Sequence, residues 1–229
     1  MASVAINLEQ LRGEIRKVAL GCGRNPDEVQ LMAVSKTFSA EQVRKARAAG
    51  QRLFGENRVQ EAEEKIPQLA DPDLEWHLIG PLQSNKAARA VQLFNVIQTL
   101  DRTKIVDRVN HFAVKSGRLM KVFVEVHIGE EAQKHGIAPA QVPEMVKLID
   151  SMEGLDLLGL MAIPPYHPEA ERSRLYFRQL AEILAGVSHW RDKPLKELSM
   201  GMSHDYRIAI EEGATLLRIG TAIFGVRSP

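Results

Sequence analysis

The feature that most constrains the fold of this chain is a regular alternation of short apolar segments with amphipathic ones. Eight segments have the length and composition of buried strands, at 29–36, 52–54, 75–79, 96–99, 119–127, 155–160, 197–200 and 215–219. Helical patterns lie at 6–20, 40–49, 58–69, 86–93, 103–115, 139–152, 168–184 and 203–211. Strands separated by helices pair in parallel, and eight such units predict a (β/α)8 TIM barrel. A doubly wound open sheet is the structural alternative.

No break in this alternation has the composition of a domain linker, so we expect a single domain over residues 1–229, with a helix within 1–22 packed on it. The formal net charge is +1, and no basic block indicates a nucleic-acid surface. The sequence contains neither an apolar run of membrane-spanning length nor a secretory signal pattern. Cys22 is the only cysteine, and the seven histidines lack the spacing of metal ligands. We therefore expect a cytoplasmic protein without a metal, a membrane contact or a nucleic-acid partner.

Lys36 ends the first apolar segment. The carboxyl ends of parallel strands are where α/β folds place their reactive groups. In a desolvated pocket a lysine pKa falls, and the neutral amine can form a Schiff base with a carbonyl compound. A lysine that simply reaches solvent from a strand end is the commoner case, so the rest of the sequence has to support a chemical role for Lys36.

Two glycine-containing segments follow the seventh and eighth strands. Ser203 is placed to cap the helix after the seventh strand, while Gly220 and Thr221 offer backbone N–H groups and a hydroxyl after the eighth. Barrels often bind phosphate with these two loops. Spacing alone favours a phosphate site and a pair of ordinary turns about equally.

Arg218 lies within the last apolar strand, where a guanidinium is costly to bury without a partner. A salt bridge inside the barrel or contact with a ligand would satisfy it. Together with Lys36 and a phosphate site, Arg218 indicates a phosphorylated carbonyl ligand. Two classes of protein remain at this point, a Schiff-base aldolase acting on a sugar phosphate and a pyridoxal-phosphate protein.

Two polar segments are expected to be ordinary surface. The run EAEEK at 61–65 has the composition of a solvated helix face. The loop 129–136 follows the long fifth strand and is expected to border the mouth of the site. We interpret Lys134 in this loop as a surface lysine rather than a second aldehyde acceptor.

Five motifs occur in order along the chain: AVSKT at 33–37, FGENRVQE at 54–61, WHLIGPLQSNK at 76–86, LSMGMS at 198–203 and RIGTAIFG at 218–225. With these motifs the chain resembles the pyridoxal phosphate homeostasis proteins, also called the proline synthase co-transcribed family, from about residue 29 to residue 227. One such motif would be weak, but five in register are highly specific.

The resemblance implies a barrel similar to the amino-terminal domain of alanine racemase, the type III fold of pyridoxal-phosphate enzymes. It also implies that Lys36 holds pyridoxal 5′-phosphate (PLP) as a Schiff base. Ser203, Gly220 and Thr221 map to phosphate-binding positions, and Arg218 maps to the position that faces the pyridine nitrogen. The full set of implied cofactor-binding residues is Lys36, Asn57, His77, Met200, Gly201, Ser203, Arg218, Gly220 and Thr221.

A guanidinium beside the ring nitrogen disfavours protonation of that nitrogen by repulsion between like charges. An unprotonated pyridine is a poorer electron sink, so stabilisation of a carbanion is weaker. The implied position of Arg218 therefore suits a PLP carrier or a narrow racemase better than a general transaminase.

The family is regarded as lacking robust catalytic activity and as acting in vitamin B6 balance and, indirectly, in amino-acid metabolism. Racemases of this fold complete their site with a second domain that supplies a tyrosine base. We expect no such domain, because the chain ends four residues after Gly225, and racemisation by two bases needs a group on each face of the substrate. We therefore expect a monomeric, non-enzymatic protein of PLP homeostasis that releases PLP to apo-enzymes. The alternatives are a low-activity PLP-dependent amino-acid racemase and the sugar-phosphate aldolase.

Overall fold

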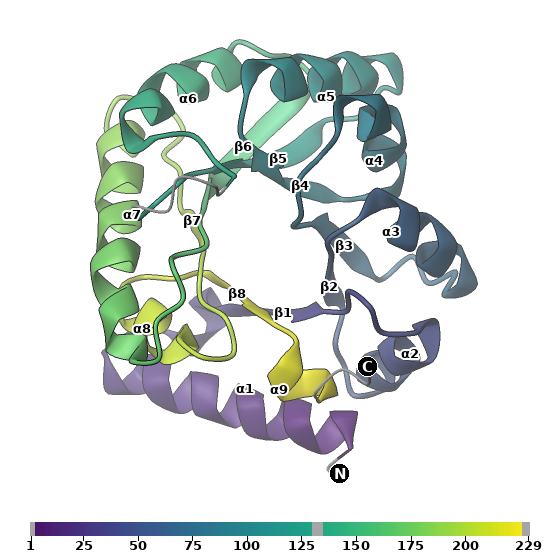
Figure 1. The fold of residues 1–229 in the computed structure, drawn as a ribbon, viewed down its shortest axis with the longest axis vertical. Helices are drawn as coiled ribbons and strands as arrows, with labels where there is room; N and C mark the ends of the chain where they lie inside the picture. Colours follow the sequence, from purple (N-terminus) through teal and green to yellow (C-terminus); the bar gives the residue numbers. More distant parts are fainter. Residues whose placement is uncertain (1–2, 130–134, 226–229) are drawn as a thin grey trace.

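Eight parallel strands close into a barrel in the order β1 to β8, and the helices form a ring around it (Figure 1). The structure is a computed structural model that describes residues 3–129 and 135–225. The strands are β1 Gln30–Val34, β2 Leu53–Glu56, β3 Glu75–Leu78, β4 Val96–Leu100, β5 Met120–Glu125, β6 Leu155–Met161, β7 Glu197–Ser199 and β8 Leu216–Ile219. The barrel prediction is confirmed, and the open sheet is wrong because β1 pairs with both β2 and β8.

The helices follow the strands in alternation, as the sequence pattern predicts. They are α1 Val4–Gly21, α2 Ala40–Ala48, α3 Val59–Lys65, α4 Ala87–Leu93, α5 Thr103–Lys115, α6 Val142–Asp150, α7 Ser173–Ser188, α8 Tyr206–Glu211 and α9 Thr221–Phe224. Short 3-10 turns lie at Pro26–Glu28, Ile66–Gln68, Ser84–Lys86, Pro139–Gln141 and Ala170–Arg172. Several predicted helices begin or end in these turns, which are frequent at helix termini.

The apolar core has two layers. A small cluster fills the barrel interior with side chains from β1, β2, β4, β5, β6 and β8 and from Ile79 just after β3: Met32, Val34, Leu53, Ile79, Val96, Phe123, Met161 and Leu216. The strand residues that alternate with these belong to the larger cluster between the sheet and the helices. A polar residue in register with the inner cluster therefore points into the barrel.

Helix α1 lies alongside α2, α8 and α9 and covers the side of the barrel formed by β8 and β1 (Figure 1). It buries Leu8, Leu11 and Ile15 along one face, which explains the amphipathic pattern of the segment. None of the helices within the described residues is long and apolar enough to cross a bilayer.

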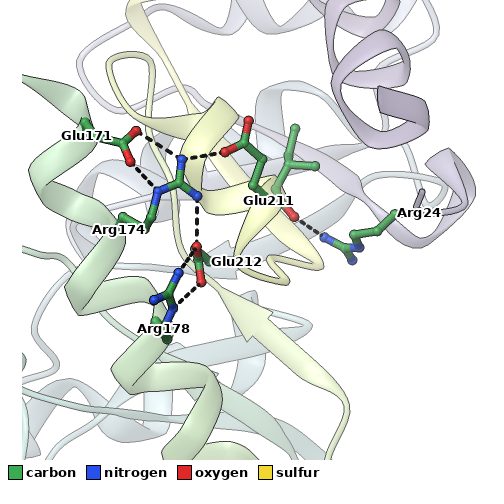
Figure 2. Close-up of polar contacts among 7 residues, drawn as sticks. Arg24, Glu171, Arg174, Arg178, Glu211 and Glu212 are labelled. Atoms are coloured by element: carbon green, nitrogen blue, oxygen red, sulfur yellow. Dashed lines mark hydrogen bonds and ion pairs between the residues drawn. The ribbon is translucent and has the colours of Figure 1, made fainter. Parts of the chain in front are cut away.

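A cluster of ion pairs connects α7 to α8 on the outside of the barrel (Figure 2). Arg174 forms ion pairs with Glu171, with Glu211 at the end of α8 and with Glu212 just after it. Arg178 also forms an ion pair with Glu212. Arg24 donates hydrogen bonds to the carbonyl oxygens of Ile210 and Ala214. These contacts hold the helix that follows β7, and with it the loop that contains Ser203.

Candidate functional site

Lys36 lies in a turn two residues beyond the end of β1, at the carboxyl end of the barrel. The lysine is partly buried, and Thr37 after it has a φ of 68°, a left-handed conformation that is uncommon for a residue other than glycine. Such a conformation persists only where the surroundings hold it. The backbone on both sides of Lys36 is therefore expected to have specific partners.

Those partners come from β2 and α3. Lys65 is 5% exposed, and its Nζ donates hydrogen bonds to the carbonyl oxygen of Ser35 at 2.8 Å, to Oε1 of Glu56 at 2.7 Å and to Oε1 of Glu61 at 2.8 Å. The expectation that 61–65 is only a solvated helix face is therefore wrong for Glu61 and Lys65. Glu61 and Lys65 lie one turn apart on the inner face of α3, because positions i and i+4 share a face, whereas Glu63 and Glu64 are exposed.

The same cluster reaches both neighbours of Lys36. Glu61 accepts a hydrogen bond from the backbone N–H of Thr37, and the Ser35 hydroxyl donates to Oε1 of Glu56 at 2.7 Å. Burial raises the pKa of the Glu56 carboxyl, and the charge of Lys65 opposes that rise. Ser35 and Thr37 are thus fixed by side chains of the FGENRVQE motif and of α3, so the backbone that carries Lys36 is held in one conformation.

Arg218 is buried inside the barrel with neutral partners. Its guanidinium donates to the hydroxyl of Ser199 at 2.7 Å and to the carbonyl oxygen of Ala162 at 2.8 Å. Burial lowers the pKa of Arg218 to about 10, and the charge of Glu125 opposes that fall. Among the described residues no carboxylate forms an ion pair with it. The internal salt bridge that the sequence left open as one explanation of Arg218 is not the arrangement found here.

A chain of hydrogen bonds runs from Arg218 across the barrel interior. The Ser199 hydroxyl, which accepts from Arg218, donates to Oε1 of Gln98 at 2.6 Å. The amide nitrogen of Gln98 then lies 2.7 Å from Nδ1 of His77, and Nε2 of His77 lies 3.0 Å from Oε1 of Glu75. With Nδ1 accepting from the Gln98 amide, the proton of neutral His77 resides on Nε2 and is donated to Glu75.

His77 therefore reaches Arg218 only indirectly, through the side chains of Gln98 and Ser199. Both of its ring nitrogens are engaged, and Glu75 at the start of β3 directs it away from the carboxyl end of the barrel. Burial lowers the pKa of His77, and the hydrogen bond to Glu75 opposes this fall. The structure brings His77 to Arg218 through Gln98 and Ser199, three bonds along a buried chain.

Two further polar groups with buried atoms lie at the end of β5 and just after it. Glu125 alternates with Phe123 of the inner cluster, and His127 follows two positions later. Oε2 of Glu125 and Nε2 of His127 are buried, and neither has a hydrogen-bond partner in the structure. Burial raises the pKa of Glu125 to about 7, with a contribution from the charge of Asp101 and an opposing one from Arg218.

The loop after β7 meets the start of α9. The hydroxyl of Ser203 accepts a hydrogen bond from the backbone N–H of Ala222 at 3.4 Å. The prediction that Ser203 caps the helix after β7 is wrong, because α8 begins at Tyr206 with Asp205 at its N-cap. Asp205 is buried and accepts from the backbone N–H of Met202 at 2.7 Å, which closes the loop before the helix can start.

The other residues predicted for the PLP site in these loops are Met200, Gly201, Gly220 and Thr221. Met200 is fully buried in the outer core layer. Gly201 has a φ of +90°, and a Cβ there would lie 2.6 Å from that of Ala209, so no other residue fits without displacement. Its carbonyl oxygen accepts from the backbone N–H of Arg218. Gly220 is the N-cap of α9 and Thr221, its first residue, is exposed.

Asn57 lies at the end of β2 and lines a cavity of about 820 Å³ beside the barrel mouth. Lys36, Arg218 and Ser203 do not line this cavity. All four residues nevertheless lie toward the carboxyl ends of the strands. Lys134 lies outside the described residues.

Sequence reasoning missed several buried or partly buried polar residues: Gln98, Glu125, His127 and Ser199 at the barrel strands, and Lys65 on α3 outside the barrel. A period-two reading of the strands would have found Glu125 and Ser199, because each alternates with outward-facing apolar residues. The irregular register between β4 and β5 removes that signal for Gln98. Lys65 has no strand pattern, and its helix places it inward only once α3 is packed against β1 and β2.

Comparison with known proteins agrees with this arrangement. The sequence profile of the alanine racemase N-terminal domain matches residues 6–228. The pyridoxal phosphate homeostasis protein of Vibrio alginolyticus is 42% identical over 231 residues, which cover 99% of each chain. PipY of Synechococcus elongatus PCC7942, solved with PLP bound, is 39% identical with a TM-score of 0.87, covering 97% of this chain and 100% of PipY.

A more distant likeness concerns the fold alone. An alanine racemase of Clostridium difficile 630 superposes with a TM-score of 0.72 at 16% identity, covering 99% of this chain and 57% of the racemase. The motifs, the closed barrel and the full-length relatives lead to one assignment. This chain belongs to the pyridoxal phosphate homeostasis protein family, with a (β/α)8 barrel of the alanine racemase N-terminal-domain type.

Proposed function

We propose that this protein binds PLP at the mouth of its barrel through Lys36 and serves in PLP homeostasis rather than as a robust enzyme. The observation that carries the proposal is the fixation of Lys36. Both neighbouring residues are held by a buried cluster, which is the preorganisation a covalent attachment point requires. PipY, a full-length relative, has been solved with PLP bound.

The polar groups of the barrel mouth fit this ligand. Arg218 uses two hydrogen bonds and retains further N–H donors toward the interior. Two buried atoms without hydrogen-bond partners, Oε2 of Glu125 and Nε2 of His127, lie at the carboxyl end of β5 and just beyond it. Buried polar atoms without partners are energetically costly, and a polar ligand would supply such partners.

We assign roles to individual residues within this proposal. Lys36 would hold the aldehyde of PLP as a Schiff base, with the carbonyl oxygen leaving as water, and Arg218 would lie toward the ring nitrogen. Ser203, Gly220 and Thr221 bind the phosphate, and Met200 and Gly201 shape that loop through their backbone. His77 acts through Gln98 and Ser199 as a positioning residue for Arg218, and Asn57 borders the site.

Bound PLP supplies an aldehyde and an electron-withdrawing ring. An arginine at the ring nitrogen keeps that nitrogen unprotonated and weakens its pull on electrons. The hydrogen-bond acceptors of the guanidinium are the Ser199 hydroxyl and the Ala162 carbonyl oxygen, neither of which is an acid, while the charge of Glu125 also acts on Arg218. This electrostatic environment supports the holding of PLP more than its use in catalysis.

We further propose that the protein works as a monomer and releases PLP to apo-enzymes. Transfer is tested by mixing the PLP-loaded protein with a PLP-free enzyme and following the recovery of its activity, with an equal concentration of free PLP as control. Recovery faster than with free PLP supports delivery by contact. If recovery is no faster than with free PLP, direct delivery is contradicted and only a storage role remains.

The binding itself is tested by absorbance. Addition of PLP to the purified protein should give the visible band of lysine-bound PLP, and Lys36→Ala should abolish it. Lys115→Ala, an exposed lysine at the far end of α5, should leave the band unchanged. A wild-type protein without the band contradicts the proposal and would favour the sugar-phosphate aldolase.

A second candidate, a low-activity amino-acid racemase, is favoured by one observation. Glu125 is the last residue of β5, the strand opposite β1 in the barrel order, and His127 follows two residues later, so a carboxyl group and an imidazole lie across the barrel from β1. Racemisation with two bases needs such groups on both sides of the substrate. A chiral assay decides, because turnover above roughly 1 per second would belong to an ordinary enzyme.

A further inference from the structure

The cavity beside the barrel mouth has a strongly basic lining. It has a volume of about 820 Å³ and lies between the loops that follow β2, β3 and β4. Its lining comprises Asn57, Arg58, Val59, Gln60, Pro81, Leu82, Gln83, Lys86, Arg102 and His135. Three permanent cations and a histidine are present, and none of the lining residues within 3–129 and 135–225 is a carboxylate. The volume is that of pockets for small organic molecules.

The two principal walls of this cavity are joined rigidly. A Cβ on Gly80 would lie 2.2 Å from the carbonyl oxygen of Asn57, so the loops after β2 and β3 approach backbone to backbone. The hydroxyl of Thr99 donates to the carbonyl oxygen of Gly80 at 2.8 Å and ties the same point to β4. The cavity is thus a built feature of the strand ends.

One of the cations is held in position. Arg102 donates to Oδ1 of Asp101 at 2.6 Å and to the carbonyl oxygen of Leu82 at 2.9 Å. A guanidinium carries five N–H donors, and these two bonds leave the others available for a ligand. The same two bonds fix the orientation of the Arg102 side chain. Asp101 also lies 3.8 Å from Nδ1 of His135 and offsets one positive charge at this wall.

The other two cations have no such compensation. Arg58 and Lys86 form no ion pair with any other residue in the described ranges, yet they line the same cavity. Like charges that converge on one cavity repel each other, and an anion bound between them offsets that repulsion. The amides of Asn57, Gln60 and Gln83 add N–H donors of the kind that orient phosphate or carboxylate oxygens.

We propose that this cavity is a second anion site, distinct from the PLP site, that binds a small organic dianion such as a phosphate monoester or a dicarboxylate. Arg58 and Lys86 bind the charged oxygens, and Arg102 fixes their orientation. The motifs FGENRVQE and WHLIGPLQSNK supply eight of the ten lining residues, and the other two are Arg102 and His135. The second site therefore gives a role to two motifs that the PLP assignment leaves largely unused.

The test is a calorimetric titration of the PLP-loaded protein with glycerol 3-phosphate and with succinate at constant ionic strength. Loading fills the PLP site, so a phosphate bound there does not contribute. Arg58→Gln and Lys86→Gln should each weaken binding by about tenfold or more, the range expected for loss of a hydrogen bond to a charged group. Lys115→Gln, which removes an exposed charge remote from the cavity, should change affinity by less than about twofold.

The two probes separate the sources of the anion, because binding of only one identifies the phosphate or the carboxylate class. Affinities that stay within twofold in both cavity variants, or the absence of binding by either probe, would overturn the proposal. The visible band of bound PLP is recorded in the same samples. A lost band with intact anion binding removes the PLP assignment alone, and the converse result removes only the second site.

Discussion

Lys65 donates a 2.8 Å hydrogen bond from its ammonium group to the backbone carbonyl oxygen of Ser35, the residue immediately before Lys36. A buried cation on a helix outside the barrel thereby fixes the backbone of the proposed PLP lysine. Its other partners are Glu56, at the end of β2, and Glu61 on the same helix. The backbone on both sides of Lys36 is therefore held by this cluster in addition to β1.

Replacement of Lys65 by Met should destabilise the protein and disturb Lys36. Glu56, whose side chain is fully buried, would lose its counter-charge, and breaking such a pair costs about 3–5 kcal/mol. Chemical denaturation measures the loss, and Glu64→Gln on the exposed side of α3 serves as the control. The double variant Lys65→Met/Glu56→Gln should recover part of the stability. An unchanged midpoint for Lys65→Met would contradict this role.

Glu125 should impose a pH dependence on the PLP-free protein. Burial raises the pKa of its carboxyl from 4.5 to about 7, so the native state keeps a proton that the unfolded chain releases. Stability contributed by this group therefore falls as pH rises from about 4.5 to 7 and is level above that. Glu125→Gln should be more stable than wild type at pH 8, by on the order of 3 kcal/mol at most, since one pKa unit corresponds to about 1.4 kcal/mol.

The same comparison at pH 4.5 should show little difference between Glu125→Gln and wild type. Glu153→Gln, at an exposed carboxylate, provides the control. Parallel stability curves for wild type and Glu125→Gln over pH 4.5–8 would show that Glu125 is ionised in the native protein.

Ser199→Ala should break the hydrogen-bond chain next to Arg218. The variant removes the acceptor of one guanidinium N–H and the donor to Gln98 inside the barrel. Leaving buried groups unsatisfied costs about 1–3 kcal/mol for each. Ser151→Ala, at an exposed hydroxyl, should change stability by less than about 0.5 kcal/mol. PLP affinity should fall in Ser199→Ala and not in Ser151→Ala. Equal affinities in the two variants would show that the Ser199–Gln98–His77 hydrogen bonds do not affect PLP binding.

Gly80→Ala should disrupt the walls of the second anion site. Its Cβ would lie 2.2 Å from the carbonyl oxygen of Asn57 and 2.8 Å from the carbonyl carbon, both backbone atoms that cannot move aside as a side chain can. Thermal unfolding should show a lower melting temperature. Gly186→Ala is a matched control, because nothing lies within 4 Å of a Cβ there and alanine in a helix is favoured by roughly 0.5–1 kcal/mol. A Gly80→Ala protein as stable as wild type would contradict the close approach.

Much of the fold followed from sequence periodicity. The alternation of strands and helices is a local signal, and eight repeats of it leave few closed architectures. Strand ends were less certain, because hydrogen bonding stops before the apolar pattern does. Lys36 was predicted at a strand tip and lies in the turn two residues beyond it.

Predictions about side-chain partners were weaker, because partners distant in sequence leave no local pattern. Ser203 has the residue type of a helix cap, yet Asp205 occupies that position and the Ser203 hydroxyl meets Ala222 instead. Lys65 belongs to a charged run that resembles a solvated face, and only the packing of α3 against the barrel turns it inward. His77 lies in a motif, but its direction depends on Glu75 and Gln98.

Reductive trapping tests the central claim most directly. The protein is incubated with PLP, treated with borohydride, digested and examined by mass spectrometry, which locates every lysine that carried the aldehyde. One pyridoxyl group on Lys36 is the predicted result, and Lys36→Ala should remain unlabelled under the same conditions. Labelling of other lysines while Lys36 stays unmodified would contradict the assignment of the barrel mouth as the PLP site.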